Sequence, residues 1–349
     1  MTFNRETAVS ALSHARRELP DTSADSVPTH SRSPFFGFRI AVLIPCYNEQ
    51  ATIAAVIEHF RDALPESVIY VYDNNSTDGT AAAARAAGAI VRPETLQGKG
   101  NVVRRMFADV EADVFILVDG DATYDAASAP EMVRILIENS LDMVNGRRTS
   151  EIAAAYRPGH RLGNRVLTGL VANIFGNRIR DMLSGYRVLS RRFVKSFPAL
   201  SGGFEIETEL TVHALELRMP IQEVDTPYRD RPPESSSKLH TIRDGIRILR
   251  TIVVLIKEER PLQFFTALSL AFAAISVALG IPLFQTYFET GLVPRLPTAI
   301  LATGIMLLAF LSFFCGLVLD TVTLGRREAK RMRYLEIPTF DGMVRNPPP

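Results

Sequence analysis

The sequence has too few cysteines and too little net charge for several common classes of protein. Its 349 residues include only two cysteines, Cys46 and Cys315, which argues against a disulfide framework and fits a reducing compartment. Tryptophan is absent altogether. The 39 lysines and arginines are balanced by 38 aspartates and glutamates, and the formal net charge of +1 predicts no nucleic-acid partner.

The N-terminal region lacks both an apolar run and a periodic pattern. No stretch there is typical of a signal peptide. Ser, Thr, Pro and Arg are common, and neither a helical nor a strand period is visible, so we expect a disordered tail over residues 1–36. The folded part of the chain is therefore predicted to begin near residue 37.

The apolar residues are concentrated near the C-terminus, which accounts for a mean hydropathy of +0.09. Residues 262–284 and 298–319 contain no Lys, Arg, Asp or Glu, and about 20 such residues are enough to cross a bilayer. We therefore predict a transmembrane helical hairpin over residues 261–320, with residues 285–297 as a short external turn. The alternative is a buried pair of helices in a soluble protein.

The segments on either side of this hairpin are basic. Residues 241–260 carry an apolar stripe at helical spacing beside a stripe of arginines, which is typical of an amphipathic helix in the membrane interface. Residues 321–349 are expected to form a basic cytosolic tail. Because positively charged flanks stay in the cytoplasm, we expect a protein of the inner membrane with both termini cytoplasmic. The flanking residues are Lys257 and Arg260 before the hairpin, and Arg326, Arg327, Lys330, Arg331 and Arg333 after it.

Residues 37–240 show strands alternating with helices. Short apolar runs at 38–45, 68–73, 89–91 and 114–118 predict buried strands, and helical patterns lie between them. This alternation indicates an α/β fold with a doubly wound, mostly parallel sheet. Further along, helical stretches at 160–176 and 204–218 flank the segment 184–192, and residues 228–239 resemble a polar loop.

Two carboxylates follow the last of these apolar runs directly. Asp119 and Asp121 leave the strand in the stretch VFILVDGDATYD, with Gly120 between them to let the backbone bend. Ligands of doubly wound sheets bind beyond the carboxyl ends of the strands, where Asp73 also lies. Carboxylates at this position suit a hard divalent cation, Mg²⁺ or Mn²⁺, which shares its ligands with substrate phosphates.

The series of motifs around these carboxylates resembles a known enzyme family. IPCYNE (44–49), YDNNSTDGT (72–80), LQGKGNVVR (96–104) and NGRR (145–148) occur in order. Together with Asp119 and Asp121 they are similar to family-2 glycosyltransferases of the GT-A (Rossmann-like) fold, over about residues 38–240. With DMLSGYRVLSR, RPPESSSKL and the C-terminal hairpin, the chain resembles polyprenyl-phosphate glycosyltransferases, such as dolichyl-phosphate mannose synthases and bacterial undecaprenyl-phosphate glucosyltransferases.

The resemblance implies a role for each matching residue. Nucleotide-binding residues on the donor side would be Pro45, Tyr47, Glu49, Asp73 and Lys99, with Asp119 and Asp121 holding the metal on the diphosphate. Acceptor-phosphate ligands would be Arg147, Arg161, Arg165 and Lys238, and Arg231 would close over the phosphates. Asp121, Arg147 and Arg231 would be the catalytic residues.

Two positions depart from the family pattern. Asn74 stands where many relatives have a second aspartate, and Thr123 stands where several have a glutamine near the metal. These departures leave the base specificity and the full metal shell open.

The implied activity is inverting transfer of a sugar from a UDP- or GDP-sugar to a polyprenyl phosphate at the cytoplasmic membrane face. Transfer to another membrane lipid and a non-catalytic, membrane-anchored nucleotide-binding protein are the alternatives. A processive polysaccharide synthase of the same superfamily would need a Gln-x-x-Arg-Trp motif, which a chain without tryptophan cannot supply. The sequence leaves a homo-oligomer open.

Overall fold

The computed structural model describes residues 37–149, 169, 179–203, 205–229, 254, 257, 258 and 260–340. Strands, in chain order, are β1 (Ile40–Cys46), β2 (Val68–Asp73), β3 (Ile90–Pro93), β4 (Val114–Leu117), β5 (Met143–Thr149), β6 (Arg187–Ser190) and β7 (Ile221–Pro227). Helices are α1 (Ile53–Ala63), α2 (Thr80–Ala86), α3 (Lys99–Asp109), the short 3₁₀ turn η1 (Ala126–Ser128), α4 (Ala129–Glu138), α6 (Arg191–Ser196), α7 (Ile206–Glu216), α9 (Pro261–Thr290) and α10 (Leu296–Leu335).

One seven-stranded sheet, in the order β3-β2-β1-β4-β6-β5-β7, organises the domain. β1, β2, β3 and β4 are parallel neighbours, and β7 is parallel to β5. β6 is antiparallel to both β4 and β5. The predicted α/β class with a doubly wound, mostly parallel sheet is confirmed.

The direction of the strands decides where a ligand can bind. β1 and β2 are paired so that Cys46 lies beside Asp73, and β4 ends next to β1. Because β4 and β5 are both antiparallel to β6, they run in the same direction. The carboxyl ends of β1, β2, β4 and β5 therefore meet at one edge of the sheet, where doubly wound folds bind their ligands.

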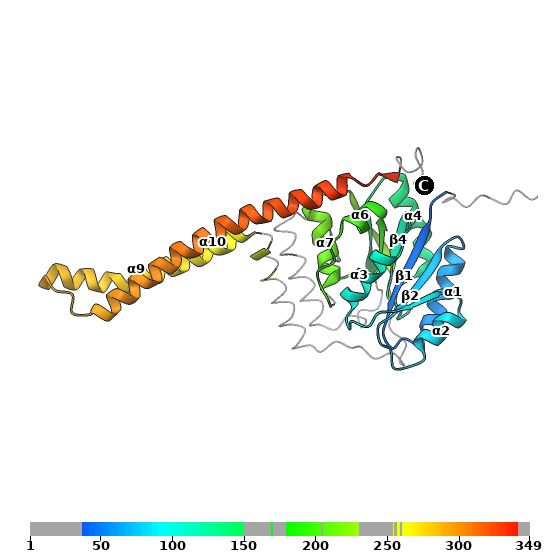
Figure 1. Cartoon of the computed structure of the whole chain (residues 1–349), viewed down its shortest axis with the longest axis horizontal. Coiled ribbons are helices and arrows are strands. Elements are labelled where there is room, and N and C mark those ends of the chain that lie inside the picture. The colour runs from blue at the N-terminus through cyan, green and yellow to red at the C-terminus, as the bar shows by residue number, and fades with distance from the viewer. Residues whose placement is uncertain are drawn as a thin grey trace, which may run out of the picture. The chain divides into compact units, whose positions relative to one another are not determined.

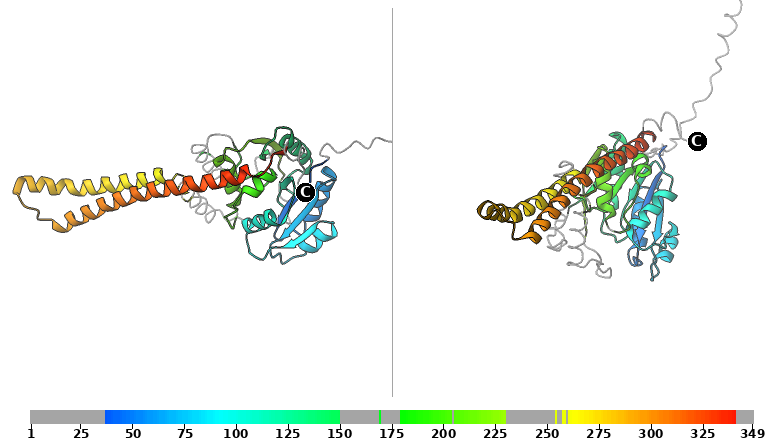
Figure 2. Two further views of the ribbon diagram at one scale, coloured as in Figure 1. Left: turned by 45° about the horizontal axis from the view of Figure 1, so that its top comes forward. Right: turned by 60° about the vertical axis from the view of Figure 1, so that its left-hand side comes forward.

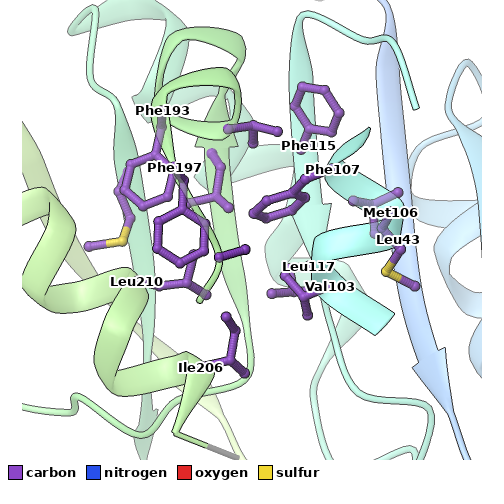
Figure 3. Close-up of a cluster of buried hydrophobic side chains, with 14 of the residues drawn as sticks. Leu43, Val103, Met106, Phe107, Phe115, Leu117, Phe193, Phe197, Ile206 and Leu210 are labelled. Atoms are coloured by element: carbon purple, nitrogen blue, oxygen red, sulfur yellow. The ribbon is translucent and has the colours of Figure 1, made fainter. Parts of the chain in front are cut away.

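Helices cover both faces of the sheet (Figure 1). α1, α2 and α4 pack on one side, and α3, α6 and α7 pack on the other. Figure 3 shows the second layer, where aromatic and aliphatic side chains of α3, α6 and α7 meet those of β1 and β4. Phe107 contacts Phe115 and Phe197 edge to face, with ring centroids 6.4 and 6.1 Å apart. This packing fixes α3 and α7 against the strands that carry the site residues.

The two apolar runs form the long antiparallel helices α9 and α10, which lie side by side in all three views (Figures 1 and 2). Both are long and apolar enough to cross a membrane, and only 6% and 17% of their apolar windows are buried within the chain. A helix pair in the core of a soluble protein would be buried instead. The break is shorter than the expected turn at 285–297, because α9 continues to Thr290 and ends at Gly291, whose φ of 68° closes the helix.

Helix α10 also continues beyond its apolar segment. Residues 321–335, the first part of the predicted basic tail, continue α10 as a helix and pack on the α/β domain. Lys330 donates a 2.7 Å hydrogen bond to the buried Glu216. The Tyr334 hydroxyl donates a 2.7 Å hydrogen bond to Asp142, and the tyrosine is only 5% exposed. The predicted interfacial helix, residues 241–260, lies almost wholly outside the described residues.

Candidate active site

The loops that follow β1 and β2 are joined to each other by hydrogen bonds from the backbone. Asn48, at φ 54°, donates its N–H to Ser76 Oγ at 2.9 Å, and Glu49 donates its N–H to Thr80 Oγ1 at 2.9 Å. Gln50 N–H donates to Asp78. IPCYNE and YDNNSTDGT are therefore parts of one surface, as the positions of their strands predict. Pro45 and Tyr47 lie partly buried in it, and Glu49 is buried.

Asp73, at the end of β2, offers an acceptor to this surface. Its Oδ2 accepts a hydrogen bond from the Ser76 N–H at 3.3 Å. Its Oδ1 is buried and has no hydrogen-bond partner among the described residues. A buried acceptor without a partner is costly in the unliganded protein. Asp73 is therefore suited to receive an N–H or O–H donor of a bound ligand.

Asp121 is held by its own loop. It is 2% exposed, and its Oδ1 accepts hydrogen bonds from Thr123 N at 3.2 Å and Thr123 Oγ1 at 2.6 Å. Thr123, one of the two departures from the family pattern, thus orients this carboxylate. The chain turns at Ala122, which has the left-handed φ of 59°, and not at Gly120 as expected. Gly120 is needed for another reason: a Cβ there would lie 2.8 Å from Cys46 Sγ.

Asp119 is paired with a lysine. Lys99 Nζ lies 2.5 Å from Asp119 Oδ1 and 2.5 Å from Glu207 Oε1, so that one ammonium group bridges two carboxylates. Burial opposes the charged form of Lys99, but the two carboxylates outweigh it and raise its pKa above the ordinary value. On the other side, Asp119 Oδ2 lies against Gly185, where any Cβ would overlap it.

The segment that carries Lys99 is set by Asn74. The Asn74 side chain donates hydrogen bonds to the carbonyls of Glu94 and Leu96, at 2.9 and 2.8 Å, and accepts one from Gly98 N–H at 2.7 Å. An aspartate could accept here but could not donate. The loop therefore needs an asparagine at position 74, because only an amide can both donate and accept these hydrogen bonds. Gly98, at φ 129°, then starts α3 at Lys99.

The same glycine-rich loop also packs tightly against the loop before α7. A Cβ on Gly98 would overlap the Gly202 carbonyl oxygen, and one on Gly100 would overlap that of Ser201. Gly100 N–H donates a 3.1 Å hydrogen bond to the Gly203 carbonyl. This contact brings Lys99 and Glu207 together although they are far apart in sequence.

Arg147 and Arg148 are neighbours on β5, and their side chains reach different partners. Arg147 forks onto its cross-strand neighbour Asp225, an ion pair whose side chains are 30% and 55% exposed. Arg148 forms a less exposed pair with Asp181, at 2.8 and 2.7 Å, and lies over the ring of Tyr228, 5.5 Å from its centroid.

Arg148 lies beside tyrosines that also feel the charges of the aspartates. The Tyr228 hydroxyl is close enough to feel the charges of Arg148, Asp121 and Asp119, and burial, the largest effect, raises its pKa. Tyr124, beside Tyr228 at a ring-centroid distance of 5.3 Å, feels Arg148 and Asp119 as well. Arg148 thus lies over a tyrosine that feels both aspartates, whereas Arg147 pairs with Asp225, and the predicted role of Arg147 in binding the acceptor stays a prediction.

Several predicted site residues lie outside the described residues and are not placed by the structure. These are Arg161, Arg165, Arg231 and Lys238.

Three contributors were not found from the sequence. Glu207 holds Lys99 and sits in the first turn of α7, so an acidic residue inside an apolar helical stretch was the available signal. Arg187 is fully buried and donates to the carbonyls of Met182 and Glu207, at 2.7 and 2.9 Å, which fixes the backbone at Glu207. Burial lowers the pKa of Arg187 to about 10, which leaves it charged at neutral pH. Tyr124 accepts the Gly185 N–H at 2.8 Å.

Residues 41–197 match the sequence model of glycosyl transferase family 2. The chain is 35% identical over 310 residues to the glycosyltransferase AglJ of Haloferax volcanii, covering 85% of this chain and 98% of that protein. The chain belongs to glycosyltransferase family 2. The predicted family is thus confirmed.

Two further proteins are similar to this glycosyltransferase. A dolichyl-phosphate hexose transferase of Haloferax volcanii is 29% identical over 224 residues, which cover 63% of this chain and 95% of that protein. Glucosyl-3-phosphoglycerate synthase of Mycobacterium tuberculosis, solved with Mn²⁺, UDP and glucosyl-3-phosphoglycerate, is similar in fold at a TM-score of 0.53 and 24% identity, over 63% of this chain and 80% of that one.

Proposed function

We propose that this glycosyltransferase transfers a sugar, with inversion, from a nucleotide-sugar to a polyprenyl phosphate at the cytoplasmic face of the inner membrane. The observation that carries the proposal is the continuity of α10. Its apolar part is exposed along a length that suits a bilayer, and the same helix ends in Lys330 and Tyr334, which pack on the catalytic domain. A catalytic domain held in this way meets an acceptor that is confined to the membrane. The name of the dolichyl-phosphate relative supports the same acceptor class.

A divalent cation fits the residues at the carboxyl end of β4. Lys99 bridges Asp119 and Glu207, and Asp119 also feels the negative charge of Asp121, so this described cluster carries an excess of negative charge. No group of three or more His, Cys, Asp or Glu side chains is arranged as metal ligands within the described ranges. A cation held by Asp119 and Asp121 would thus need further oxygens, and a donor diphosphate offers them. When bound, Mg²⁺ or Mn²⁺ supplies charge neutralisation of the leaving diphosphate.

The donor would lie along the surface formed by the first two motif loops. In this proposal Pro45, Tyr47 and Glu49 frame the nucleoside, and the unpaired Oδ1 of Asp73 accepts a hydrogen bond from it. Lys99 lies at the other end of the surface, beside the aspartates that would face the diphosphate.

The reaction needs no strong general base. The second pKa of a phosphate monoester is near 6, so the acceptor is largely dianionic at neutral pH. One of its oxygens forms a bond to the anomeric carbon, while the bond from that carbon to the diphosphate oxygen breaks and the nucleoside diphosphate leaves with the electron pair. The protein must then hold two anions near one carbon, and guanidinium groups match phosphate oxygens well.

Arg148 is the described residue best placed to hold the acceptor phosphate. It lies on the same side as Tyr228 and the two aspartates, and its position is fixed by Asp181. Arg161, Arg165, Arg231 and Lys238 remain proposed phosphate ligands from the resemblance alone.

The test is transfer by the full chain in lipid nanodiscs. Labelled UDP- and GDP-sugars would be offered with undecaprenyl phosphate, dolichyl phosphate or diacylglycerol, and the lipid product identified by mass spectrometry. We expect one sugar on a polyprenyl phosphate, and loss of the product with EDTA or in the variant Asp121→Asn. A product formed only on diacylglycerol would contradict the proposed polyprenyl-phosphate acceptor. Transfer at full rate in metal-free buffer would contradict the proposed requirement for a divalent cation.

A further inference from the structure

Lys99 occupies the carboxylate oxygen that the proposed metal would also use. Its Nζ lies 2.5 Å from Asp119 Oδ1, and Lys99 and Asp119 have side chains only 10% and 28% exposed. The second oxygen of Asp119 lies against Gly185. We propose that Lys99 competes with the divalent cation for Asp119, so that the cation binds tightly only together with the nucleotide diphosphate. This inference rests on the proposed function.

The competition follows from charge. Two cations at one carboxylate repel each other, and this repulsion is stronger in a partly buried site than in water. A cation that arrives alone must therefore displace the Lys99 ammonium or share Asp119 with it. Either way, part of its binding free energy is lost.

Glu207 makes the displacement feasible. It lies 2.5 Å from Lys99 Nζ and is 8% exposed, so the ammonium keeps one carboxylate when it leaves Asp119. Arg187 donates to the backbone carbonyl of Glu207 at 2.9 Å, which fixes the main chain from which this carboxylate extends. When the metal binds Asp119, Lys99 can therefore keep its ion pair with Glu207.

A diphosphate changes the balance in favour of the metal. It brings negative charge that can pair with Lys99, and it brings oxygens that complete the metal shell. Each of the two ligands therefore makes room for the other, and by linkage the gain in affinity is the same in both directions. Lys99 acts as a positioning residue that discourages a bare cation from occupying the site.

The test measures binding of Mn²⁺, with and without UDP or GDP, by the electron paramagnetic resonance signal of free Mn²⁺. The full chain in nanodiscs would be compared with Lys99→Met and with the matched control Lys195→Met. Lys195 donates to the carbonyls of Phe107 and Val110, away from the aspartates. We expect Lys99→Met to bind Mn²⁺ alone about tenfold more tightly or better. The gain that the nucleotide gives should shrink, and Lys195→Met should match the unmutated chain.

Glu207→Gln provides the opposite change, and Lys99→Gln, which also removes the charge but keeps a polar side chain, decides the matter if Lys99→Met does not fold. With its second carboxylate gone, Lys99 should hold Asp119 more firmly, and Mn²⁺ alone should bind more weakly. A lysine with only a structural role predicts weaker binding for both variants, and equal or weaker binding of Mn²⁺ by Lys99→Met would overturn the inference. So would an unmutated chain that binds no Mn²⁺ with either nucleotide. Sugar transfer by the unmutated chain, measured in parallel, separates these outcomes from a failure of the proposed function.

Discussion

Arg147 and Arg148 allow a matched test of how the acceptor phosphate binds. They are adjacent on β5, but Arg147 pairs with Asp225 whereas Arg148 pairs with Asp181. We predict that Arg148→Ala raises the apparent KM for polyprenyl phosphate, whereas Arg147→Ala leaves it close to the unmutated value. The basis is the position of Arg148 over Tyr228, against the exposed cross-strand pair that Arg147 forms with Asp225.

The magnitudes differ in both affinity and stability. Losing one charged hydrogen bond costs about 1.5–3 kcal/mol, so KM for the acceptor should rise roughly ten- to hundredfold for Arg148→Ala. This change also leaves Asp181, 8% exposed, without its cation, and breaking such a pair costs about 3–5 kcal/mol when fully buried. The pair of Arg147 is half exposed, and such pairs contribute about 0–1 kcal/mol.

The assay is steady-state transfer with each substrate varied in turn, together with thermal unfolding of each variant. Because Arg148→Ala lowers stability, Arg148→Lys is included: it keeps a charge but loses the planar fork, so it should recover part of the acceptor KM. A large acceptor effect in Arg147→Ala with none in Arg148→Ala would refute the reasoning from geometry. If Arg148→Ala changed only the KM for the nucleotide-sugar, Arg148 would lie on the donor side of the site, and the proposed positions of the two substrates would be exchanged.

Three further predictions concern other parts of the chain. Gly185→Ala should lose Mn²⁺ binding in the presence of nucleotide, measured by calorimetry, because its methyl group would collide with the Asp119 carboxylate. Burial, and to a lesser degree Lys330, lowers the pKa of His213 to about 3. Since the unfolded chain binds this proton near pH 6.5, stability should fall by up to about 1.4 kcal/mol per unit as pH drops from 6.5 towards 3, and His213→Gln should flatten that slope in denaturant titrations. Tyr334→Phe should lower the thermal midpoint, through loss of about 1 kcal/mol from its hydrogen bond to Asp142, without changing nucleotide affinity.

The strands and the two aspartates could be predicted because the signals are local. A run of buried apolar residues such as 114–117 reads as a strand without any knowledge of its neighbours, and the order of the motifs fixes the fold class. The position of Asp119 at the carboxyl end of its strand follows from the same pattern. These features depend on residues that are close in sequence.

The partners of these residues could not be predicted, because they depend on contacts that are distant in sequence. Glu207 meets Lys99 only because two glycine-rich loops pack together. The difference between Arg147 and Arg148 depends on the pairing of β5 with β7, which aligns Arg147 with Asp225. A basic stretch at the end of the chain reads as a tail until its acidic partners, such as Glu216, are brought beside it.

The docking of α10 lies at the opposite end of β5 from the site. Asp142 directly precedes β5 and is 1% exposed, with Arg192, Ser190 and Tyr334 as its hydrogen-bond partners. Arg148 is near the other end of the same strand, and at about 3.3 Å per residue the two positions are roughly 20 Å apart. The contact between Tyr334 of α10 and Asp142 therefore lies too far from the site to touch the substrates. It acts on the domain as a whole, so weakening it should affect the meeting with a membrane-bound acceptor while a soluble nucleotide binds as before.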